Sequence, residues 1–379
     1  MTTLISFLYK QLIKPILFLF DPSRVHHWFS NIGYISGKYK IIRLCFSSVF
    51  AKTYPSLQQI VDGIQYIAPV SIAAGFDKDL KLIEISPSLG TGFHTIWSLT
   101  AKPYEGNPGP RLVRLPSNAS ILVNYGLKNK GIDIHIPYIE KIQGGGLKQP
   151  LRISIAKTNC SIVCDIDEAI SDYCYSLEQL HKHRIGSAYE INISCPNAFG
   201  AEDFSNADKL DRLLMAIMKI GITKPLYLKM PADSPRNQYK AIIDVALNYK
   251  ISGIIFSNLT KQRDFLYPQE QEKIRNISWW LSGKPCFAIT LSNIAKSYEY
   301  ISGRMTIIGC GGIVSAQDAY EMISNGANLL QLITGMIFEW PQLFADINSG
   351  LDKFLQRDGF KNISEAVGWK VMRKDKLLN

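Results

Sequence analysis

Cysteine is scarce in this sequence, and the few cysteines follow no regular spacing. The 379-residue chain has seven of them, and no two form a Cys-x-x-Cys pair; Cys160 and Cys164 stand too far apart. An odd, irregular set argues against a disulfide framework or a zinc site, and for reduced thiols in a cytosolic compartment. The six histidines form no metal-binding pair with a partnering glutamate. We therefore expect neither a disulfide scaffold nor a metal centre.

Runs of basic residues are also absent, although the formal net charge is +10. Lysine and arginine are scattered singly and are not interleaved with stacking aromatic residues. This distribution argues against nucleic-acid binding. A basic protein can equally lie against an anionic membrane surface.

No segment has the composition of a membrane-spanning helix. The stretch Leu4 to Phe20 is rich in Leu, Ile and Phe, but it contains Lys10, Lys14 and Pro15, and no small-residue cleavage site follows it. Spanning helices need about 20 predominantly apolar residues, and secretory signals end in such a cleavage site. The stretch is therefore expected to be an ordinary apolar helix.

A second helix is predicted to begin at Asp21-Pro22, because Asp caps helices and Pro suits their first turn. Apolar residues then recur at helical spacing at Val25, Trp28, Phe29, Ile32 and Ile35. An amphipathic pair this apolar either packs on a core or lies in a membrane interface. Of the two alternatives, we favour packing.

The rest of the chain has no linker and no low-complexity segment. After a hairpin expected at Ile60–Tyr66, with its turn at Asp62-Gly63, apolar runs bounded by glycine or polar turns recur eight times. These runs are Val70–Ala74, Thr95–Ser98, Leu151–Ala156, Ala188–Ile193, Leu226–Met230, Gly253–Ser257, Met305–Gly309 and Leu329–Ile333. Helical patterns lie between most of them. The rhythm predicts an α/β fold, a (β/α)8 TIM barrel with an N-terminal helical extension.

The expected domain limits follow from this pattern. Residues 1–50 form the helical extension and residues 57–379 form the barrel. The segments after the second and sixth strands, 101–146 and 259–281, are longer than ordinary connections. We expect them to cover the catalytic face as a loop or a small subdomain.

The stretch Tyr189 to Asn197 has the composition of an active-site strand end. It passes from a β-favouring apolar run into a polar turn that holds Asn192, Cys195 and Asn197. In a barrel, reactive groups come from the carboxyl ends of the strands. Taken alone, however, the window fits an active site and an ordinary buried strand with Cys195 as a small apolar filler equally well.

The other strand ends carry groups that suit a bound cofactor. The first strand ends in small residues followed by Lys78, and the fifth ends in Lys229; both lysines could neutralise a cofactor's charge or form salt bridges. Gly309–Ile313 and Gln331–Gly335 close the last two strands, where barrels bind phosphate through exposed backbone N–H groups. Ser282-Gly283 could add another backbone contact.

Taken together, these residues resemble the dihydroorotate dehydrogenase family, specifically its membrane-associated, quinone-dependent branch. The resemblance runs nearly end to end. It rests on Asp21-Pro22-x-Arg24-x-His26, Ala73-Ala74-Gly75-Phe76-Asp77-Lys78, Lys102-Pro103-x-Glu105-Gly106-Asn107-Pro108, Pro110-Arg111-Leu112, Asn192-Ile193-Ser194-Cys195-Pro196-Asn197, Leu281-Ser282-Gly283-Lys284-Pro285, Gly309-Cys310-Gly311-Gly312, Arg357-Asp358-Gly359-Phe360 and Glu365-Ala366-Val367-Gly368.

The resemblance implies an FMN cofactor across the barrel top. The implied cofactor-binding residues are Ala73, Ala74, Gly75, Lys78, Ser98, Asn192, Lys229, Ser257, Ser282, Gly283, Gly311, Gly312, Ile333 and Thr334. Gly335 is implied near the phosphate as well.

The resemblance also implies the reaction, the oxidation of dihydroorotate to orotate in pyrimidine biosynthesis. Cys195 would act as general base while hydride passes to flavin N5. The implied substrate-binding residues are Lys78, Asn192, Asn197 and Asn258. Electrons would pass to a quinone through an apolar tunnel in the N-terminal helices, making the chain a peripheral membrane protein on the cytoplasmic face.

The sequence departs from the family pattern at several positions. Cys195 replaces the serine usual in the quinone-dependent branch; the thiol pKa of about 8.5 lies closer to working pH than that of a hydroxyl. Val123 and Leu259 replace substrate-binding polar residues, and Ser154 and Ala156 replace the usual Asn and Gly of the third strand. Two alternatives therefore stay open: an FMN oxidoreductase acting on another dihydropyrimidine or cyclic amide, and a catalytically inactive FMN-binding homologue.

Overall fold

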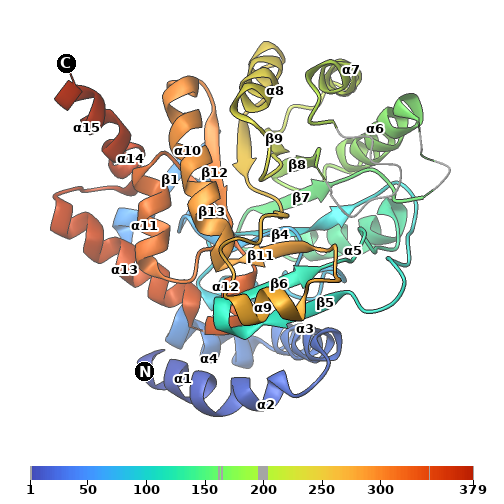
Figure 1. The fold of residues 1–379 in the computed structure, drawn as a ribbon. Coiled ribbons are helices and arrows are strands. Elements are labelled where there is room, and N and C mark those ends of the chain that lie inside the picture. The colour runs from blue at the N-terminus through green and yellow to red at the C-terminus, as the bar shows by residue number, and fades with distance from the viewer. Residues whose placement is uncertain (1, 161–162, 164, 195–203, 341, 379) are drawn as a thin grey trace.

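The computed structural model describes residues 2–160, 163, 165–194, 204–340 and 342–378, with side chains up to residue 373. Eight parallel strands close into a barrel, and helices surround it (Figure 1). In chain order the barrel strands are β3 (Val70–Ile72), β4 (Phe93–Leu99), β7 (Leu151–Ile155), β8 (Ala188–Asn192), β9 (Leu226–Lys229), β10 (Gly253–Phe256), β12 (Thr306–Cys310) and β13 (Leu329–Leu332). They coincide with the eight predicted runs, so the predicted (β/α)8 barrel is confirmed.

Each barrel strand is buried along its whole length, as expected for parallel strands covered by helices. The covering helices are α5 (Ile132–Gly144), α6 (Ile166–Lys182), α7 (Ala207–Met218), α8 (Arg236–Asn248), α10 (Phe287–Ile301), α11 (Ala316–Ser324) and α13 (Leu343–Asp358). Short helices α12 (Thr334–Glu339) and α14 (Ile363–Ala366) and the C-terminal helix α15 (Trp369–Leu378) complete this shell. The main apolar core lies between strands and helices.

The amino-terminal end of the barrel is covered by the predicted hairpin, β1 (Gln59–Val61) and β2 (Ile64–Tyr66). Its two turn residues, Asp62 and Gly63, both have positive φ, as a two-residue hairpin turn requires. Tyr66 packs against Phe93 inside the barrel. The hairpin does not cover the opposite end of the barrel, where the carboxyl ends of the strands lie and where barrels bind their ligands.

The two long insertions come together above that carboxyl end. The first contributes β5 (Leu112–Leu115) and β6 (Ser120–Val123), and the second leads through α9 (Pro268–Lys273) into β11 (Trp280–Gly283). These strands form one antiparallel sheet in the order β11-β6-β5, which Figure 1 shows between the barrel strands and the N-terminal helices. The expectation of a small covering subdomain is confirmed.

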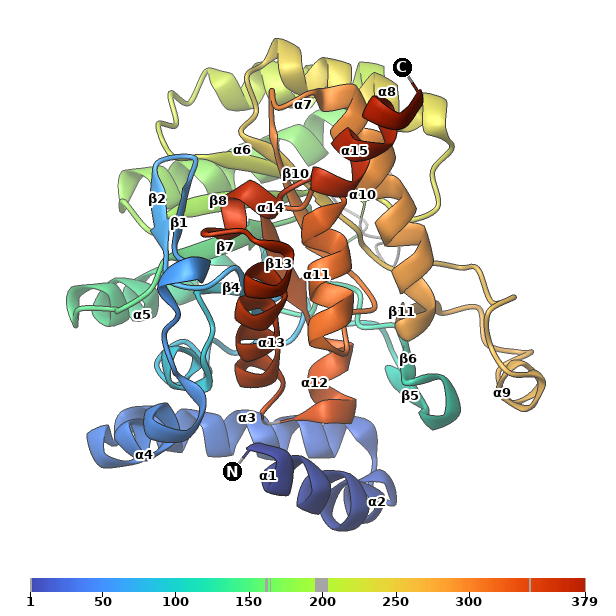
Figure 2. The same ribbon diagram turned by 90° about the vertical axis from the view of Figure 1, so that its left-hand side faces the viewer.

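The N-terminal helices form a separate layer beneath α12 and α13 (Figure 2). They are α1 (Thr2–Leu8), α2 (Lys14–Phe18), α3 (Pro22–Lys38) and α4 (Lys40–Phe50). The first predicted helix is interrupted by a π-helical turn, Tyr9–Ile13, in which Lys14 N–H bonds the Tyr9 carbonyl. Pro15 lacks the N–H that a regular α-helical ladder needs at the next position, which accounts for the change of pitch.

The start of α3 is as predicted: the Asp21 side chain accepts a hydrogen bond from Arg24 N–H, and Pro22 occupies the first turn. The layer is fixed to the barrel by Tyr9, whose hydroxyl donates to the Ile337 carbonyl at 2.7 Å, and by Phe29, which stacks edge-on with Trp340.

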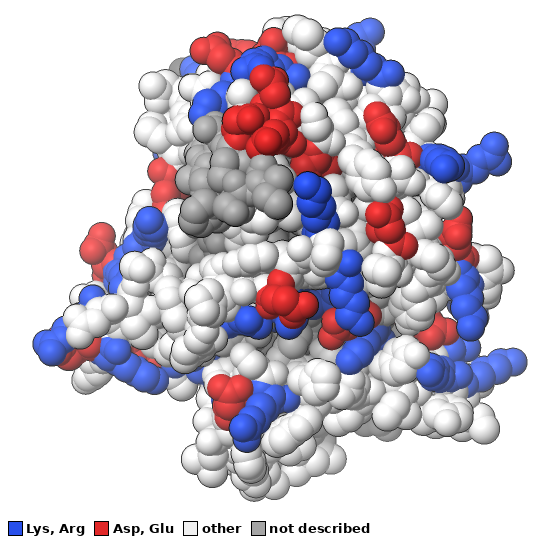
Figure 3. Space-filling model, turned by 90° about the vertical axis from the view of Figure 1, so that its right-hand side faces the viewer, with Lys and Arg blue, Asp and Glu red and all other residues white. Residues whose placement is uncertain are grey.

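The outer side of this layer is unusually apolar. Of the 23 large apolar side chains that are exposed in the described part of the chain, 14 fall between Leu4 and Leu44. Figure 3 shows few charged side chains on the lowest part of the molecule, where these helices lie. Packing on the core, the alternative favoured from the sequence, therefore explains the apolar residues on the inner side of these helices but not those on the outer side. None of the described helices is both long and apolar enough to cross a membrane.

Candidate active site

A cavity of about 1130 Å³, including its open mouth, lies at the carboxyl end of the barrel, under the β11-β6-β5 sheet. Fourteen residues expected at the site line it: Ala74, Gly75, Lys78, Ser98, Asn192, Lys229, Ser257, Asn258, Ser282, Gly311, Gly312, Ile333, Thr334 and Gly335. They come from seven of the eight barrel strands and from β11. Chain segments far apart in sequence thus meet as the barrel arrangement predicts.

Four other predicted residues lie elsewhere or outside the described residues. Ala73 is fully buried in the barrel interior, beneath the cavity. Gly283 packs against the Ala119–Ser120 backbone at the start of β6. Cys195 and Asn197 lie outside the described residues.

Glycines shape the end of the cavity near β12 and β13. Gly311 and Gly312 follow β12 with φ of +140° and +75°. A Cβ on Gly312 would lie 2.6 Å from the Phe287 backbone nitrogen, so this close approach excludes a side chain. Ser282 and Thr334 hydroxyls lie 2.9 Å apart at the same end. Bare backbone and two hydroxyls suit a phosphate group.

The first strand borders a narrow part of the cavity. Gly75 has φ +137°, and a Cβ there would lie 2.6 Å from Ile333 Cδ1. Ala74 precedes it, and Lys229 reaches toward the Ala74 carbonyl, with Nζ 3.5 Å from the oxygen. Small residues beside a buried lysine suit a flat ring that carries negative charge.

Polar side chains at the ends of β4, β8 and β10 form a linked group. Ser98 Oγ lies 2.8 Å from Ser154 Oγ and accepts a hydrogen bond from Asn192 Nδ2 at 3.3 Å. Asn258 Nδ2 donates to Asn192 Oδ1 at 3.1 Å and to the Ser194 carbonyl at 3.1 Å. These bonds hold both amides in place, as recognition of a polar substrate requires.

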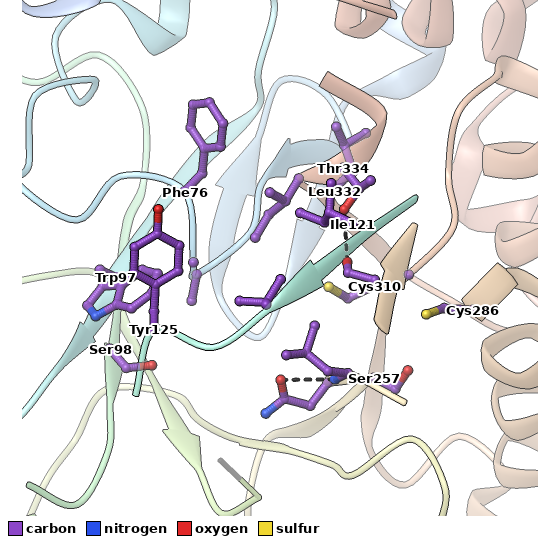
Figure 4. A pocket seen from close by; sticks show the side chains of 18 of the residues that line it. Phe76, Trp97, Ser98, Ile121, Tyr125, Ser257, Cys286, Cys310, Leu332 and Thr334 are labelled. Atoms are coloured by element: carbon purple, nitrogen blue, oxygen red, sulfur yellow. Dashed lines mark hydrogen bonds between the residues drawn. The ribbon is translucent and has the colours of Figure 1, made fainter. Parts of the chain in front are cut away.

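Two aromatic rings cover Lys78. Its Nζ lies 2.9 Å from the centroid of the Tyr125 ring and 5.3 Å from that of Trp97. Burial lowers the pKa of Lys78 well below its ordinary value, and the Asp79 carboxylate opposes the shift. Figure 4 shows Trp97, Tyr125 and Ser98 on one side of the cavity and Cys310, Leu332 and Thr334 on the other.

Sequence reasoning missed several apolar and thiol residues of the wall. Trp97, Cys286, Cys310 and Leu332 all line the cavity. Burial raises the pKa of both thiols, that of Cys286 to about 12, so they are poor nucleophiles. A signal for the thiols was present, since each stands within or next to a glycine-containing motif.

Two of the substituted positions, Val123 and Leu259, lie on the wall as well. Val123, Leu127 and Leu259 line the cavity and present apolar surface to it. Lys128 follows Leu127 in the same loop but is not among the lining residues; its Nζ lies 3.4 Å from a Glu105 carboxylate oxygen in an exposed ion pair. This side of the cavity therefore offers few polar contacts.

A second cavity, of about 1000 Å³, lies between the N-terminal helices and the barrel. Its wall is mostly apolar, with Arg114 and His26 among its few polar groups. Arg114 Nη1 donates to the Phe20 carbonyl at 2.9 Å and so holds the turn before α3. Burial lowers the pKa of His26 well below its ordinary value, so the ring is neutral.

The two cavities share part of their walls. The shared residues are His26, Phe76, Leu112, Ile121 and Ile337. The rings of His26 and Phe76 meet edge to face with centroids 4.8 Å apart. One layer of side chains therefore separates the first cavity, which contains the linked polar group, from the second, mostly apolar cavity.

Comparison with known proteins identifies the family. A sequence model described as dihydroorotate dehydrogenase matches residues 56–355. The chain is 31% identical over 360 residues to a dihydroorotate dehydrogenase (quinone) of Gloeobacter violaceus, covering 94% of this chain and 98% of the relative. It is 33% identical over 366 residues to the protein of the same name from Crocosphaera subtropica, covering 95% and 92%.

A solved structure of the Eimeria tenella enzyme in complex with ferulenol has the same fold. Its TM-score is 0.81 at 24% sequence identity, over 92% of this chain and 96% of that one. The agreement of family model, full-length relatives and barrel architecture shows that this chain belongs to the dihydroorotate dehydrogenase family.

Proposed function

We propose that this chain oxidises dihydroorotate to orotate with FMN as cofactor and passes the electrons to a quinone. One observation carries the proposal: a cavity suited to a flavin and a polar substrate shares a wall with an apolar cavity between the N-terminal helices. Family membership and the quinone-dependent relatives support it.

The residues present fit FMN. Gly311, Gly312, Ser282 and Thr334 would hold its phosphate, because they offer backbone without side chains and two adjacent hydroxyls. Ala74, Gly75, Lys78 and Lys229 would contact the ring, and the buried Lys229 beside Ala74 suits a ring that carries negative charge. When bound, FMN supplies the hydride acceptor.

The chain's own contribution is to orient the substrate and remove a proton. Asn192 and Asn258, held by mutual hydrogen bonding, would present amide groups to the substrate's ring. Cys195 would take the proton from the carbon next to a substrate carbonyl, and Asn197 would add an amide. The sheet above the cavity would exclude water during this transfer.

The apolar cavity would take the quinone. Its apolar wall suits a quinone ring and tail, while His26 and Arg114 could donate hydrogen bonds to quinone oxygens. Residues 1–50 would then serve as the quinone and membrane-association region, with residues 57–379 as the FMN-binding barrel. We place the protein at the cytoplasmic face of the membrane.

A second candidate differs in substrate alone. Val123, Leu127 and Leu259 make one side of the cavity apolar, which favours a dihydropyrimidine or cyclic amide without the carboxylate. A polar group of the substrate left unpaired there would cost about 1–3 kcal/mol. The proposals differ in which compound reduces the flavin.

The experiment is anaerobic mixing of the purified flavoprotein with dihydroorotate, followed by flavin absorbance. Bleaching by dihydroorotate supports the first proposal, and bleaching by other dihydropyrimidines alone rejects it in favour of the second. Cys195→Ala should slow bleaching by about a hundredfold or more, as loss of a general base does. Cys174→Ala, on the outer helix α6, is the matched control and should leave the rate unchanged. Bleaching at the same rate in both variants would show that Cys195 is not the base, and a flavin that no candidate substrate bleaches would indicate an inactive flavin-binding homologue.

A further inference from the structure

A third hollow lies on the surface between α3, α4 and α5, separate from both cavities described above. Its volume is about 1700 Å³, including the open space above it. Five cationic side chains line this basic groove: Lys38, Lys40, Arg43, Lys141 and Lys148. Glu84 is the one carboxylate among the lining residues. The groove therefore has a strong excess of positive charge.

Little of this charge is neutralised locally. Arg43 Nη1 lies 3.9 Å from a Glu84 carboxylate oxygen, a loose pair in which both side chains are about one third exposed. Lys40, Lys141 and Lys148 are exposed, and within the described ranges none of them forms an ion pair. Unpaired cations converging on a hollow favour an anionic ligand.

The groove lies at the edge of the apolar N-terminal layer. Helices α3 and α4 form part of its wall and, with Tyr39 between them, also expose Ile35, Ile41 and Leu44, of which Ile41 is 76% exposed. Leu44 belongs to both surfaces, since it lines the groove and is 59% exposed. Figure 2 shows α5 above α4, and Figure 3 shows basic side chains just above the mostly uncharged lowest part of the molecule.

We propose that the basic groove binds the phosphate headgroup of an anionic phospholipid while the apolar outer side of α1 to α4 enters the acyl region. Basic residues attract anionic headgroups, and exposed Leu and Ile side chains partition into the acyl boundary. The cation-rich groove suits the anionic headgroup of such a lipid, and the apolar layer directly beside it suits the acyl chains. This lipid site is not part of the proposed function. It rests on that function only in assuming that the quinone is taken from a membrane.

The test is flotation of the full-length flavoprotein with vesicles of phosphatidylcholine alone or mixed with phosphatidylglycerol. The native protein should bind the mixed vesicles more tightly, and the advantage should shrink at high salt. The variant Lys40→Glu/Lys141→Glu/Lys148→Glu should bind the mixed vesicles about tenfold or more weakly, with binding to phosphatidylcholine unchanged. The milder Lys40→Gln/Lys141→Gln/Lys148→Gln, which adds no like-charge repulsion, should show a smaller loss in the same direction.

A matched control carries the same charge change elsewhere. Lys219→Glu/Lys250→Glu/Lys296→Glu alters three exposed lysines at α7, after α8 and on α10, at the opposite end of the molecule in Figure 1. Retained lipid binding by this control supports the proposal. An equal loss in the control, or no loss in either groove variant, overturns it.

Inorganic phosphate distinguishes a lipid site from a site for soluble anions. Calorimetry should detect no binding of inorganic phosphate to the groove; binding that the groove variants abolish, without any phosphatidylglycerol advantage, overturns the lipid proposal. Flavin bleaching by dihydroorotate in solution should be the same in the groove variants and the native protein. If bleaching fails in all proteins while the flotation pattern holds, the proposed function is wrong and the lipid site stands.

Discussion

Asn258 Nδ2 donates a hydrogen bond to Asn192 Oδ1 at 3.1 Å, joining the end of β10 to the end of β8 at the cavity. The second amide hydrogen of Asn258 goes to the Ser194 carbonyl, and its Oδ1 accepts from Leu259 N–H at 3.1 Å. Both donor hydrogens of Asn258 are therefore committed to the protein, and its remaining capacity toward a substrate is that of an acceptor. Asn258 thus both positions Asn192 and offers a carbonyl oxygen.

The first prediction concerns this amide pair. Asn258→Asp keeps the shape but sets a carboxylate oxygen against Asn192 Oδ1, so kcat/KM for the substrate should fall by about ten- to a hundredfold. Stopped-flow flavin reduction measures this loss, and flavin content, which should stay near that of the native protein, is the control. An unchanged kcat/KM would show that the pair takes no part in substrate binding.

The second prediction tests the apolar cavity. Val25 lines this cavity on α3 and is absent from the wall of the other one. Val25→Trp should fill space meant for the quinone and raise the KM for a short-chain quinone by about tenfold, since such a side chain competes directly for the volume. Turnover with a water-soluble dye should stay within about twofold. Val25→Ala is the control, and a loss of dye turnover equal to that of quinone turnover would contradict the assignment.

The third prediction concerns a buried ion pair beneath the cavity. Arg152 Nε donates to Glu190 Oε1 at 2.7 Å, and both side chains are fully buried inside the barrel. Glu190→Gln or Arg152→Met alone should lower the free energy of unfolding by about 3–5 kcal/mol, because each leaves a buried group without its partner. Chemical denaturation measures the change. The double variant Arg152→Met/Glu190→Gln should lose less than the two single losses combined, and strict additivity would show that the pair is uncoupled.

The fourth prediction is a pH dependence of stability. Burial, with a smaller effect of Lys130, lowers the pKa of His135 to about 4. In the unfolded chain the ring titrates near pH 6.5, so between about pH 6.5 and 4 the unfolded state holds a proton that the folded state lacks. The free energy of unfolding should therefore fall as the pH drops through this window, by about 2 kcal/mol at pH 5 relative to neutral pH.

His135→Leu removes this titration while keeping an apolar side chain on the buried side of α5. Denaturant titrations of both proteins at neutral pH and near pH 5 give the comparison. The variant should lose about 2 kcal/mol less than the native protein on acidification. Equal losses would mean that His135 becomes protonated in the folded protein at the same pH as in the unfolded chain.

Local patterns were enough to predict much of this structure. The apolar runs and turn residues located the barrel strands, because each strand is a short buried segment with a clear stop. Asp21-Pro22 located the start of α3 for a similarly local reason, since capping depends on neighbouring atoms. The π-helical turn at Tyr9–Ile13 was not foreseen, because Pro15 permits several local adjustments and tertiary contacts select one.

The site residues likewise fall into those that local patterns could predict and those that depend on tertiary packing. Residues at strand ends, such as Asn192, Lys229 and Gly312, could be placed at the cavity from the sequence, because barrel topology alone brings strand ends together. Trp97, Cys286 and Leu332 could not, because whether such a side chain faces a cavity or the core depends on packing that the sequence pattern does not record. Ala73 illustrates the converse, since its motif suggested a wall position and its side chain is buried in the barrel interior.

The sequence by itself determined the fold, the family and the strand ends that surround the cofactor cavity, because these depend on periodicity and on motifs that each occupy a short stretch of chain. The tertiary structure alone decided that the two cavities share His26, Phe76 and Ile121, and that Lys40 and Lys141 converge on one groove at the edge of an apolar layer. Those residues lie far apart in the chain, and only the packing of the N-terminal helices against the barrel brings them together.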